Sequence, residues 1–539
     1  MPKTDREICE SKEILRQMCS LKVTSEPHPF RQPAIIGTLG PACTDTSNIL
    51  LLIKAGMNVA RINMAHIDPC NMRDPFRNVI EANNQYIVME DFDIPISIMM
   101  DLKGPEIRTG KIDSNRIKKG SPQELYLKHG SFVRLTVNKL FENRCTEKII
   151  YVNYIGLLEQ ACDGDIIYLG DGQIKLVVDL IENENVVCFV EKAGKLKDNQ
   201  KVHVPMLPAI IPALSPFDEE CLKLAIEMDV DVVVVPSARN SVVVKEIKNA
   251  LKENKILVFS KISSCEGLEN IDEILRISDG IIIQKNDLSL EISAEKMFIA
   301  QKQIIGKCNA AGKPVLCTAE FSSWFSGNVI VRRAEINDVS NAIIDGADGI
   351  ILITETALGN EGVTVVSELS RVITEAEAVT MQKTFFCDLT KELTPSVEPI
   401  NAIALAAVQI ANKIQASAIL TITNSGRTAQ LLSWFRPRRP IIAITRVGRV
   451  ARQLNLWRAV LPLHYSGEPL DDWFQDVKSR FEYGISYGKN RGIIECGDLL
   501  VLVSGYRKKA GFTNCIRIVF ASFDQSRIVE NLSNYYEEP

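Results

Sequence analysis

The sequence lacks the features of a membrane, secreted or nucleic-acid-binding protein. In its 539 residues no apolar run approaches the roughly 18–20 residues that a membrane helix needs. The start, MPKTDREICESKEILRQMCS, mixes charges and lacks the basic-then-apolar order of a signal peptide. Lysine and arginine total 62 against 67 aspartate and glutamate, and the net charge of −5 argues against a polyanionic partner. We therefore expect a cytoplasmic protein that binds neither nucleic acid nor membrane.

The common metal and nucleotide motifs are also missing. Fourteen cysteines occur without a C-x-x-C pair, and there are only five histidines, so we expect neither a zinc cluster nor a histidine-based catalytic triad. Cys188 and Cys317 lie inside apolar segments and are interpreted as buried, reduced thiols. The chain has no P-loop and no G-x-G-x-x-G that opens a helix. Nucleotide binding by those two routes is excluded.

What the sequence does contain is a repeated alternation of short apolar runs and longer helical stretches. Eight runs rich in β-branched residues have the pattern of strands buried on both faces of a parallel sheet. They occupy residues 34–40, 58–64, 96–103, 231–237, 256–263, 280–286, 314–320 and 349–355. Eight such units predict a closed (β/α)8 or TIM barrel, and an open doubly wound sheet is the alternative.

Two changes of pattern divide the chain further. Short alternating strands with turn residues between the third and fourth runs predict a β-rich domain inserted in a barrel loop. After the eighth run a second series of α and β segments predicts a separate C-terminal α/β domain. The expected divisions are an N-terminal arm at 1–30, a barrel at 31–104 and 206–380, an inserted domain at 105–205 and a C-terminal domain at 381–539.

Charged and amide side chains lie at or just beyond the carboxyl ends of the expected barrel strands, where (β/α)8 enzymes hold their active sites. They are Arg61, Asn63, Asp101, Lys103, Lys261, Asp287, Glu320 and Glu355. Each alone fits an ordinary solvated loop residue. Together, cations, an amide and carboxylates on one face suit a charged substrate and a divalent cation.

A second candidate site lies in the C-terminal domain, where the strand ILTIT leads into N-S-G-R-T at residues 424–428 before a helix. Backbone N–H groups, hydroxyls and a guanidinium at a helix N-terminus can bind a phosphate. The same residues also fit a plain helix cap, so the residues alone leave both interpretations open.

Taken together, these segments resemble pyruvate kinase from about residue 31 to residue 520. The similar blocks are GTLGPAC (37–43), AGMNVARINMAH (55–66), DLKGPEIRTG (101–110), SDGIIIQKNDLSLEI (278–292), AGKPVLC (311–317), RRAEINDVSNAIIDGAD (332–348), NSGRTA (424–429), FRPRRPIIAITR (435–446) and GFTN (511–514). The resemblance implies a TIM barrel, an inserted β-barrel lid domain and a C-terminal regulatory domain. It also implies a tetramer that transfers a phosphoryl group from phosphoenolpyruvate to ADP in glycolysis, giving pyruvate and ATP.

The resemblance also implies roles for individual residues. Catalysis is implied for Lys261 and Arg61, since a cation beside the transferring phosphoryl group offsets developing charge. The implied substrate contacts are Arg61, Lys261, Asn286 and Asp287, and the implied nucleotide contacts are Asn63, His66 and Arg108. The implied Mg2+ ligand is Asp287, and the implied K+ ligands are Asn63 and Asp101.

Several positions depart from the family pattern. Ser263 stands where the second Mg2+ carboxylate is expected, and Ala319 stands where a threonine serves enolate protonation. Ala65 and Leu102 replace hydroxyl residues of the K+ site, and Gln200 replaces the lid lysine that reaches the nucleotide. Loss of a positioned proton-transfer group typically costs ~10²–10⁴-fold in rate. We therefore expect slow or impaired turnover, weak Mg2+ binding and little need for K+.

The expected effector pocket follows the family pattern more closely. The matching residues are Thr423, Ser425, Gly426, Arg427, Thr428, Trp473 and Arg480. The resemblance implies that fructose bisphosphate binds there. The alternative function is therefore an inactive subunit that binds sugar phosphate and regulates active homologues in a homo- or hetero-tetramer. Glu320, where the family has glutamine, is a further candidate to replace the missing Mg2+ carboxylate.

Overall fold

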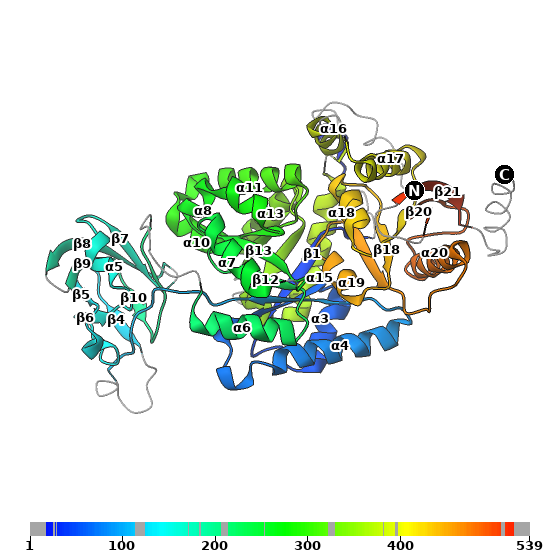
Figure 1. Cartoon of the computed structure of the whole chain (residues 1–539). Helices are drawn as coiled ribbons and strands as arrows, with labels where there is room; N and C mark the ends of the chain where they lie inside the picture. Colours follow the sequence, from blue (N-terminus) through cyan, green and yellow to red (C-terminus); the bar gives the residue numbers. More distant parts are fainter. Residues whose placement is uncertain are drawn as a thin grey trace.

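The computed structural model describes residues 18–521 with gaps at 25–26, 28–29, 114–123, 171, 183–184, 206–213, 253, 322–328, 360, 381, 394–396 and 508–512. Residues 1–17 of the predicted arm and residues 522–539 lie outside the described part. Figure 1 shows the inserted domain to the left of a central barrel and the C-terminal domain to its right.

The eight predicted apolar runs form eight parallel strands that close into a barrel, so the TIM-barrel prediction is confirmed and the open-sheet alternative is wrong. Each strand lies within its predicted run. The strands are β1 (Ala34–Leu39), β2 (Val59–Asn63), β3 (Ser97–Asp101), β12 (Val232–Val235), β13 (Leu257–Ile262), β14 (Gly280–Ile283), β15 (Val315–Ala319) and β16 (Gly349–Leu352), with β16 paired to β1.

Alternate residues of the barrel strands pack into separate cores, as the period of two in a strand requires. Ile35 packs in the layer between strands and helices, whereas Ile36, Phe259 and Ile282 pack in another cluster. Gly280 makes room for this second core, because a Cβ at Gly280 would collide with the Phe259 ring.

Helices surround the barrel and begin and end at expected signals. The helix α3 begins after Asp45, whose side chain accepts the N–H of Asn48, and it ends at Gly56 with φ at 117°. The helical segments of the barrel region are α3 (Thr46–Ala55), η1 (Met64–His66), η2 (Pro69–Asn71), α4 (Asp74–Glu90), α6 (Pro216–Glu227), α7 (Ser241–Leu251), α8 (Cys265–Glu269), α9 (Ile271–Ile277), α10 (Lys285–Glu291), η5 (Ala294–Lys296), α11 (Met297–Ala311), α13 (Val329–Asp345), α14 (Thr354–Ala357) and α15 (Gly362–Ala378).

The insertion is β-rich, as predicted, and has its own apolar core. Its six-stranded sheet has the order β11-β7-β8-β9-β5-β6, and β10 pairs with β4 in a second sheet. Its elements are β4 (Leu125–Leu127), β5 (Phe132–Thr136), η4 (Lys139–Phe141), β6 (Ile149–Tyr151), α5 (Gly156–Gln160), β7 (Ile166–Leu169), β8 (Ile174–Glu182), β9 (Asn185–Lys192), β10 (Gly194–Leu196) and β11 (Val202–His203).

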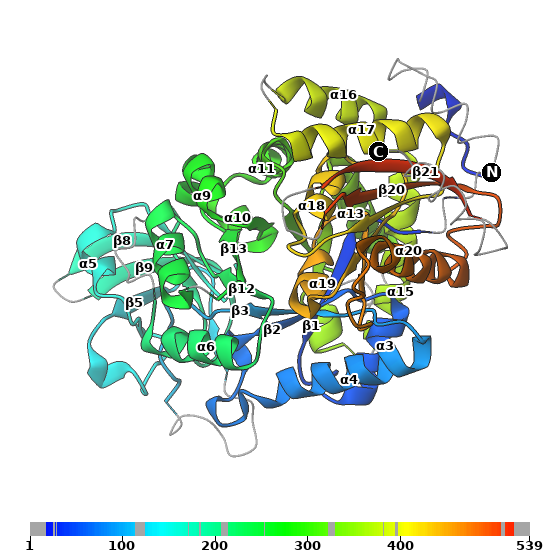
Figure 2. The ribbon, with the colours of Figure 1, turned by 45° about the vertical axis from the view of Figure 1, so that its right-hand side comes forward.

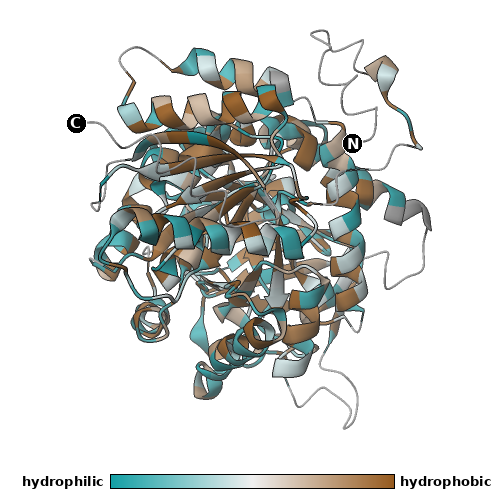
Figure 3. Ribbon diagram, turned by 90° about the vertical axis from the view of Figure 1, so that its right-hand side faces the viewer, coloured by the Kyte–Doolittle hydropathy of each residue, from teal (hydrophilic) through white to brown (hydrophobic). Residues whose placement is uncertain are grey.

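The C-terminal domain is an α/β unit with sheet order β19-β18-β17-β20-β21, in which β21 runs antiparallel to β20. Figure 3 shows its strands as brown apolar ribbons with helices beside them. Its elements are α16 (Gln382–Glu392), α17 (Pro399–Ile414), β17 (Ala418–Ile422), α18 (Arg427–Trp434), β18 (Ile441–Thr445), α19 (Gly448–Leu454), β19 (Val460–His464), α20 (Trp473–Asn490), β20 (Leu499–Gly505) and β21 (Thr513–Phe520). Among the described helices, none combines the length and apolar character needed to cross a membrane.

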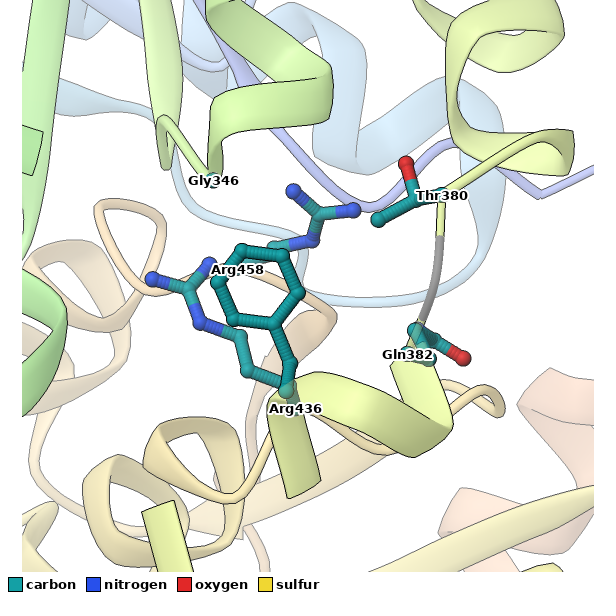
Figure 4. Close-up of a pocket in the computed structure, with 6 residues that line it drawn as sticks. Gly346, Thr380, Gln382, Arg436 and Arg458 are labelled. Carbon is teal, nitrogen blue, oxygen red and sulfur yellow. The ribbon is translucent and has the colours of Figure 1, made fainter. Parts of the chain in front are cut away.

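Ion pairs join the barrel to the C-terminal domain. Arg452 of α19 donates from Nε to Oδ1 of Asp231 over 2.8 Å, and Asp231 has no exposed surface. Arg449, also on α19, pairs with Asp229, which is half exposed. Elsewhere at the junction, a cavity is lined by Gly346, Thr380, Gln382, Phe385, Arg436 and Arg458, and Figure 4 shows both guanidinium groups beside it.

Removal of the Arg452 charge should destabilise the protein more than removal of the Arg449 charge. Arg452→Met leaves Asp231 buried without its cation, which costs about 3 kcal/mol or more. Arg449→Met breaks a more exposed pair and should cost about 1 kcal/mol or less. Urea unfolding at pH 8 should show this difference in the free energy of unfolding. Equal decreases in the two variants would contradict the prediction.

The cost of Arg452→Met should also depend on pH. Burial raises the pKa of Asp231 to about 7, although Arg452 and the N–H of Ile98 oppose the shift. Between the ordinary carboxyl pKa and about 7, the folded protein holds a proton that the unfolded chain has lost, so the contribution of this group to stability falls as pH rises through that window. The variant should therefore lose less stability at pH 5.5 than at pH 8.

Candidate active site

Three of the predicted site residues meet at the carboxyl ends of β2, β3 and β13. Asp101 lies between two cations: Arg61 donates to its Oδ2 through Nε at 3.0 Å, and Nζ of Lys261 lies 2.9 Å from Oδ1 and 2.8 Å from Oδ2. Thr38 of β1 accepts a further hydrogen bond from Nη1 of Arg61 at 2.7 Å. Strand pairing places Thr38 opposite Arg61, so the barrel register aligns this contact.

Asp101 has no exposed surface, and its two cations keep it ionised. Burial by itself would raise its pKa, but the charges of Lys261 and Arg61 outweigh burial and hold the pKa below its ordinary value. Burial lowers the pKa of the Lys261 ammonium, and the charge of Asp101 opposes this shift. Two cations against one carboxylate leave an excess positive charge, which suits an anionic ligand such as a phosphate or carboxylate.

The first turn of α10, which follows β14, holds the other predicted substrate residues, and each is already paired. Asn286 donates from Nδ2 to Oε1 of Glu320. Asp287 accepts a hydrogen bond from Nζ of Lys201 at 2.8 Å, and Lys201 belongs to the inserted domain. Lys285 pairs with Asp338 at 2.9 Å. The carboxylate expected to bind metal therefore faces an ammonium.

The residues present do not fit a divalent ion held by protein carboxylates. Ser263 is buried, and its Oγ lies 3.0 Å from Oγ of Ser237. Glu320, the suggested replacement, is hydrogen-bonded to Asn286. Within the described ranges, no group of three or more His, Cys, Asp and Glu side chains is placed to hold a metal ion. Asp287 alone remains, and Lys201 occupies its Oδ2.

The predicted nucleotide and K+ residues make mostly local contacts. Asn63 accepts the N–H of Ala65 at 3.1 Å and so caps the short helix η1, which also contains His66. Leu102 is buried and supplies no side-chain oxygen. In the inserted domain, Arg108 pairs with Glu106 and donates to the carbonyl of Asn199 at 2.7 Å. Gln200 packs against Gly170 of its own domain, because a Cβ at Gly170 would collide with its side chain.

Two further residues beyond the strand ends, Glu355 and Lys103, have contacts of their own. Glu355 is buried and accepts the N–H groups of Phe321 and Ile353, which explains it as a structural carboxylate. The ammonium of Lys103 lies 6.0 Å from the centre of the Phe217 ring. Ala319 is 3% exposed and presents only a methyl group.

The predicted effector residues lie at the β17–α18 junction and on α20. Gly426 has φ at 82° and donates its N–H to Oγ1 of Thr423 at 2.9 Å, and Thr428 contacts Thr513 at 3.0 Å. Ser425 is exposed. Arg427 pairs with Glu398 at 2.6 Å.

Arg480 lies below the surface of this region, on α20. Its guanidinium is 5.4 Å from the Trp473 ring centre and donates to Asp476. Burial would raise the pKa of Asp476, but hydrogen bonds from Arg446 and the charge of Arg480 lower it to about 2. Arg480 therefore shares the Asp476 carboxylate with Arg446, a residue outside α20.

Comparison with known proteins agrees with the fold. A family model described as pyruvate kinase, barrel domain, matches residues 30–366, and one described as pyruvate kinase, alpha/beta domain, matches residues 401–519. The chain belongs to the pyruvate kinase family. It is 39% identical to pyruvate kinase PKLR of Homo sapiens over 94% of this chain and 88% of that protein. It is 33% identical to pyruvate kinase 2 of Saccharomyces cerevisiae over 94% of this chain and 98% of that protein.

Pyruvate kinases generally use Mg2+ and K+. Two contributors to the site were not predicted. Thr38 lies in the GTLGPAC block, but only the barrel register shows that it meets Arg61. Lys201 is preceded and followed by ordinary polar and apolar residues, and only the position of the inserted domain brings it to Asp287.

Restoring the missing carboxylate should restore metal affinity. Ser263→Glu adds a negative oxygen donor at the end of β13, beside the strand β14 that leads to Asp287. Mg2+ should therefore bind about tenfold tighter, because affinity follows the charge of the ligand set. Titration calorimetry would measure the Mg2+ affinity, with Ser263→Gln as the uncharged control of equal size. Equal Mg2+ affinity in the two variants would contradict this expectation.

Proposed function

We propose that this chain is a slow pyruvate kinase that transfers a phosphoryl group from phosphoenolpyruvate to ADP. The arrangement of Arg61, Asp101 and Lys261 supports this assignment most directly, because it presents cationic donors at the mouth of the barrel. Arg61 is held in place by Asp101 and Thr38, so its position is preorganised before a substrate binds.

Lys261 has the central role in this proposal. Its ammonium would lie beside the transferring phosphoryl group and the enolate oxygen, and would stabilise the charge that develops there. Ala319 cannot hold or move a proton, so protonation of the enolate should be slow and should limit turnover. Ala65 and Leu102 provide no side-chain oxygen for K+, so we infer that activity depends little on that ion.

Lys261→Met should abolish the activity. The purified chain with phosphoenolpyruvate, ADP, Mg2+ and K+ should form pyruvate at a low rate, and the variant should lose at least about 100-fold, as expected for removal of one transition-state donor. Arg61 still neutralises Asp101 in the variant, so the barrel should stay folded. Lys248→Met, which removes a cation of α7 that pairs with Asp279, is the matched control. Equal rates for parent and Lys261→Met would contradict the assignment.

The second candidate function is an inactive subunit that binds sugar phosphate and regulates active homologues in a tetramer. The absence of a carboxylate at Ser263 and of a hydroxyl at Ala319 favours it. Ser425 and Arg427 are exposed at the start of α18, where a phosphate would meet N–H groups and a guanidinium. Because Arg427 pairs with the exposed Glu398, the phosphate would have to displace that carboxylate.

Fructose bisphosphate should therefore raise the melting temperature of the chain through mass action, whether or not the chain is active. Ser425→Glu should remove this shift, because it places a negative charge at the helix start, and Ser425→Gln should retain most of it. Differential scanning calorimetry would measure both variants. An unchanged melting temperature of the parent at millimolar ligand would leave this segment as an ordinary helix cap.

A further inference from the structure

The inserted domain contacts the short barrel helix α10. Lys201 contacts Asp287 at 2.8 Å, and Nε2 of His203 lies 2.9 Å from Oε1 of Glu291. A Cβ at Gly172 would meet the side chain of Leu290 at 2.9 Å, so the backbone of the inserted domain also lies against this helix. Figures 1 and 2 show the inserted domain on the side of the barrel that carries α10.

The two polar contacts have nearly the same spacing on the inserted domain as on α10. Residues two apart in an extended segment point to the same face and are separated by roughly 6.7 Å. Residues four apart on a helix also share a face and are separated by roughly 6 Å along the axis. Lys201 and His203 have the first spacing, and Asp287 and Glu291 have the second, so the two rows of side chains align. We call the segment 201–203 the latch.

The alternation of the latch explains which residue reaches the barrel. Gln200, the position that matches the nucleotide-contacting lysine, packs against Gly170 within the inserted domain. Its neighbour Lys201 points to the opposite face, where Asp287 lies. Both partners are largely shielded from solvent, with exposed side-chain fractions of 28% for Lys201 and 19% for Asp287, so their attraction is screened less than at an open surface.

We propose that Lys201 is a built-in counter-cation for Asp287, so that the latch and a divalent ion compete for one carboxylate. With Lys201 on Asp287, the inserted domain is held against α10 and the metal affinity of the site is low. A divalent ion that takes Asp287 must displace the ammonium and release this contact. The inference rests on the proposed function in one respect, since it takes Asp287 as part of the phosphoryl-transfer site.

The test measures metal binding and the contact with α10, with Mn2+ alone as the probe. Lys201→Gln removes the ammonium and keeps a polar side chain of similar length. Mn2+ should then bind about tenfold tighter, as expected for loss of one shielded competing charge. Amide hydrogen exchange of residues 285–291, measured without metal, should become about tenfold faster, because the helix loses its partner.

Two controls separate this role from a general change of charge. Lys195→Gln makes the same charge change in the inserted domain, but Lys195 pairs with Glu124 of that domain, so both readouts should match the parent. Lys201→Arg keeps a cation and should also behave as the parent. The proposal is overturned if Lys201→Gln binds Mn2+ no more tightly than the parent, or if exchange in α10 does not change.

These measurements do not depend on turnover. Absence of pyruvate formation by the parent would contradict the proposed function and leave the competition at Asp287 intact. Unchanged Mn2+ binding in Lys201→Gln would overturn the latch and leave the phosphoryl-transfer assignment intact.

Discussion

A fully buried carboxylate at the mouth of the barrel determines how the active-site strands meet. Asp101 has no contact with solvent, and an isolated charge in that position would be strongly destabilising. Arg61 and Lys261 compensate it from two other strands, and Thr38 fixes Arg61 from a third. Because two cations face one carboxylate, the same contacts that stabilise the barrel leave one positive charge for a ligand.

The barrel was predictable because its strands are buried on both faces. That burial requires continuous apolar runs, and no alternation with polar residues obscures them. The shared edge of the functional residues was predictable for the same reason, since the carboxyl ends of parallel strands lie together. The cations that neutralise Asp101 could not be predicted. Lys261 comes from β13, which is separated from β3 by β12.

The contacts between the inserted domain and the barrel could not be predicted from the sequence, for a different reason. Lys201 and Asp287 are 86 residues apart, and their meeting depends on the orientation of one domain on another. Arg480 is the opposite case. Asp476 lies four residues before it on the same helix, a spacing that brings side chains together, so this pair could have been read from the sequence.

The substitutions at the metal side of the site are consistent with one another when their charges are considered together. A divalent ion is balanced by two carboxylates, whereas one carboxylate is balanced by one ammonium. On the proposed assignment, Ser263 stands at one carboxylate position and Lys201 pairs with Asp287 at the other, so Asp287 is neutralised without a bound ion. Loss of the carboxylate at 263 alone would leave Asp287 uncompensated beside α10. The Lys201 ammonium removes that cost, and on this proposal part of the expected metal site becomes a contact between domains.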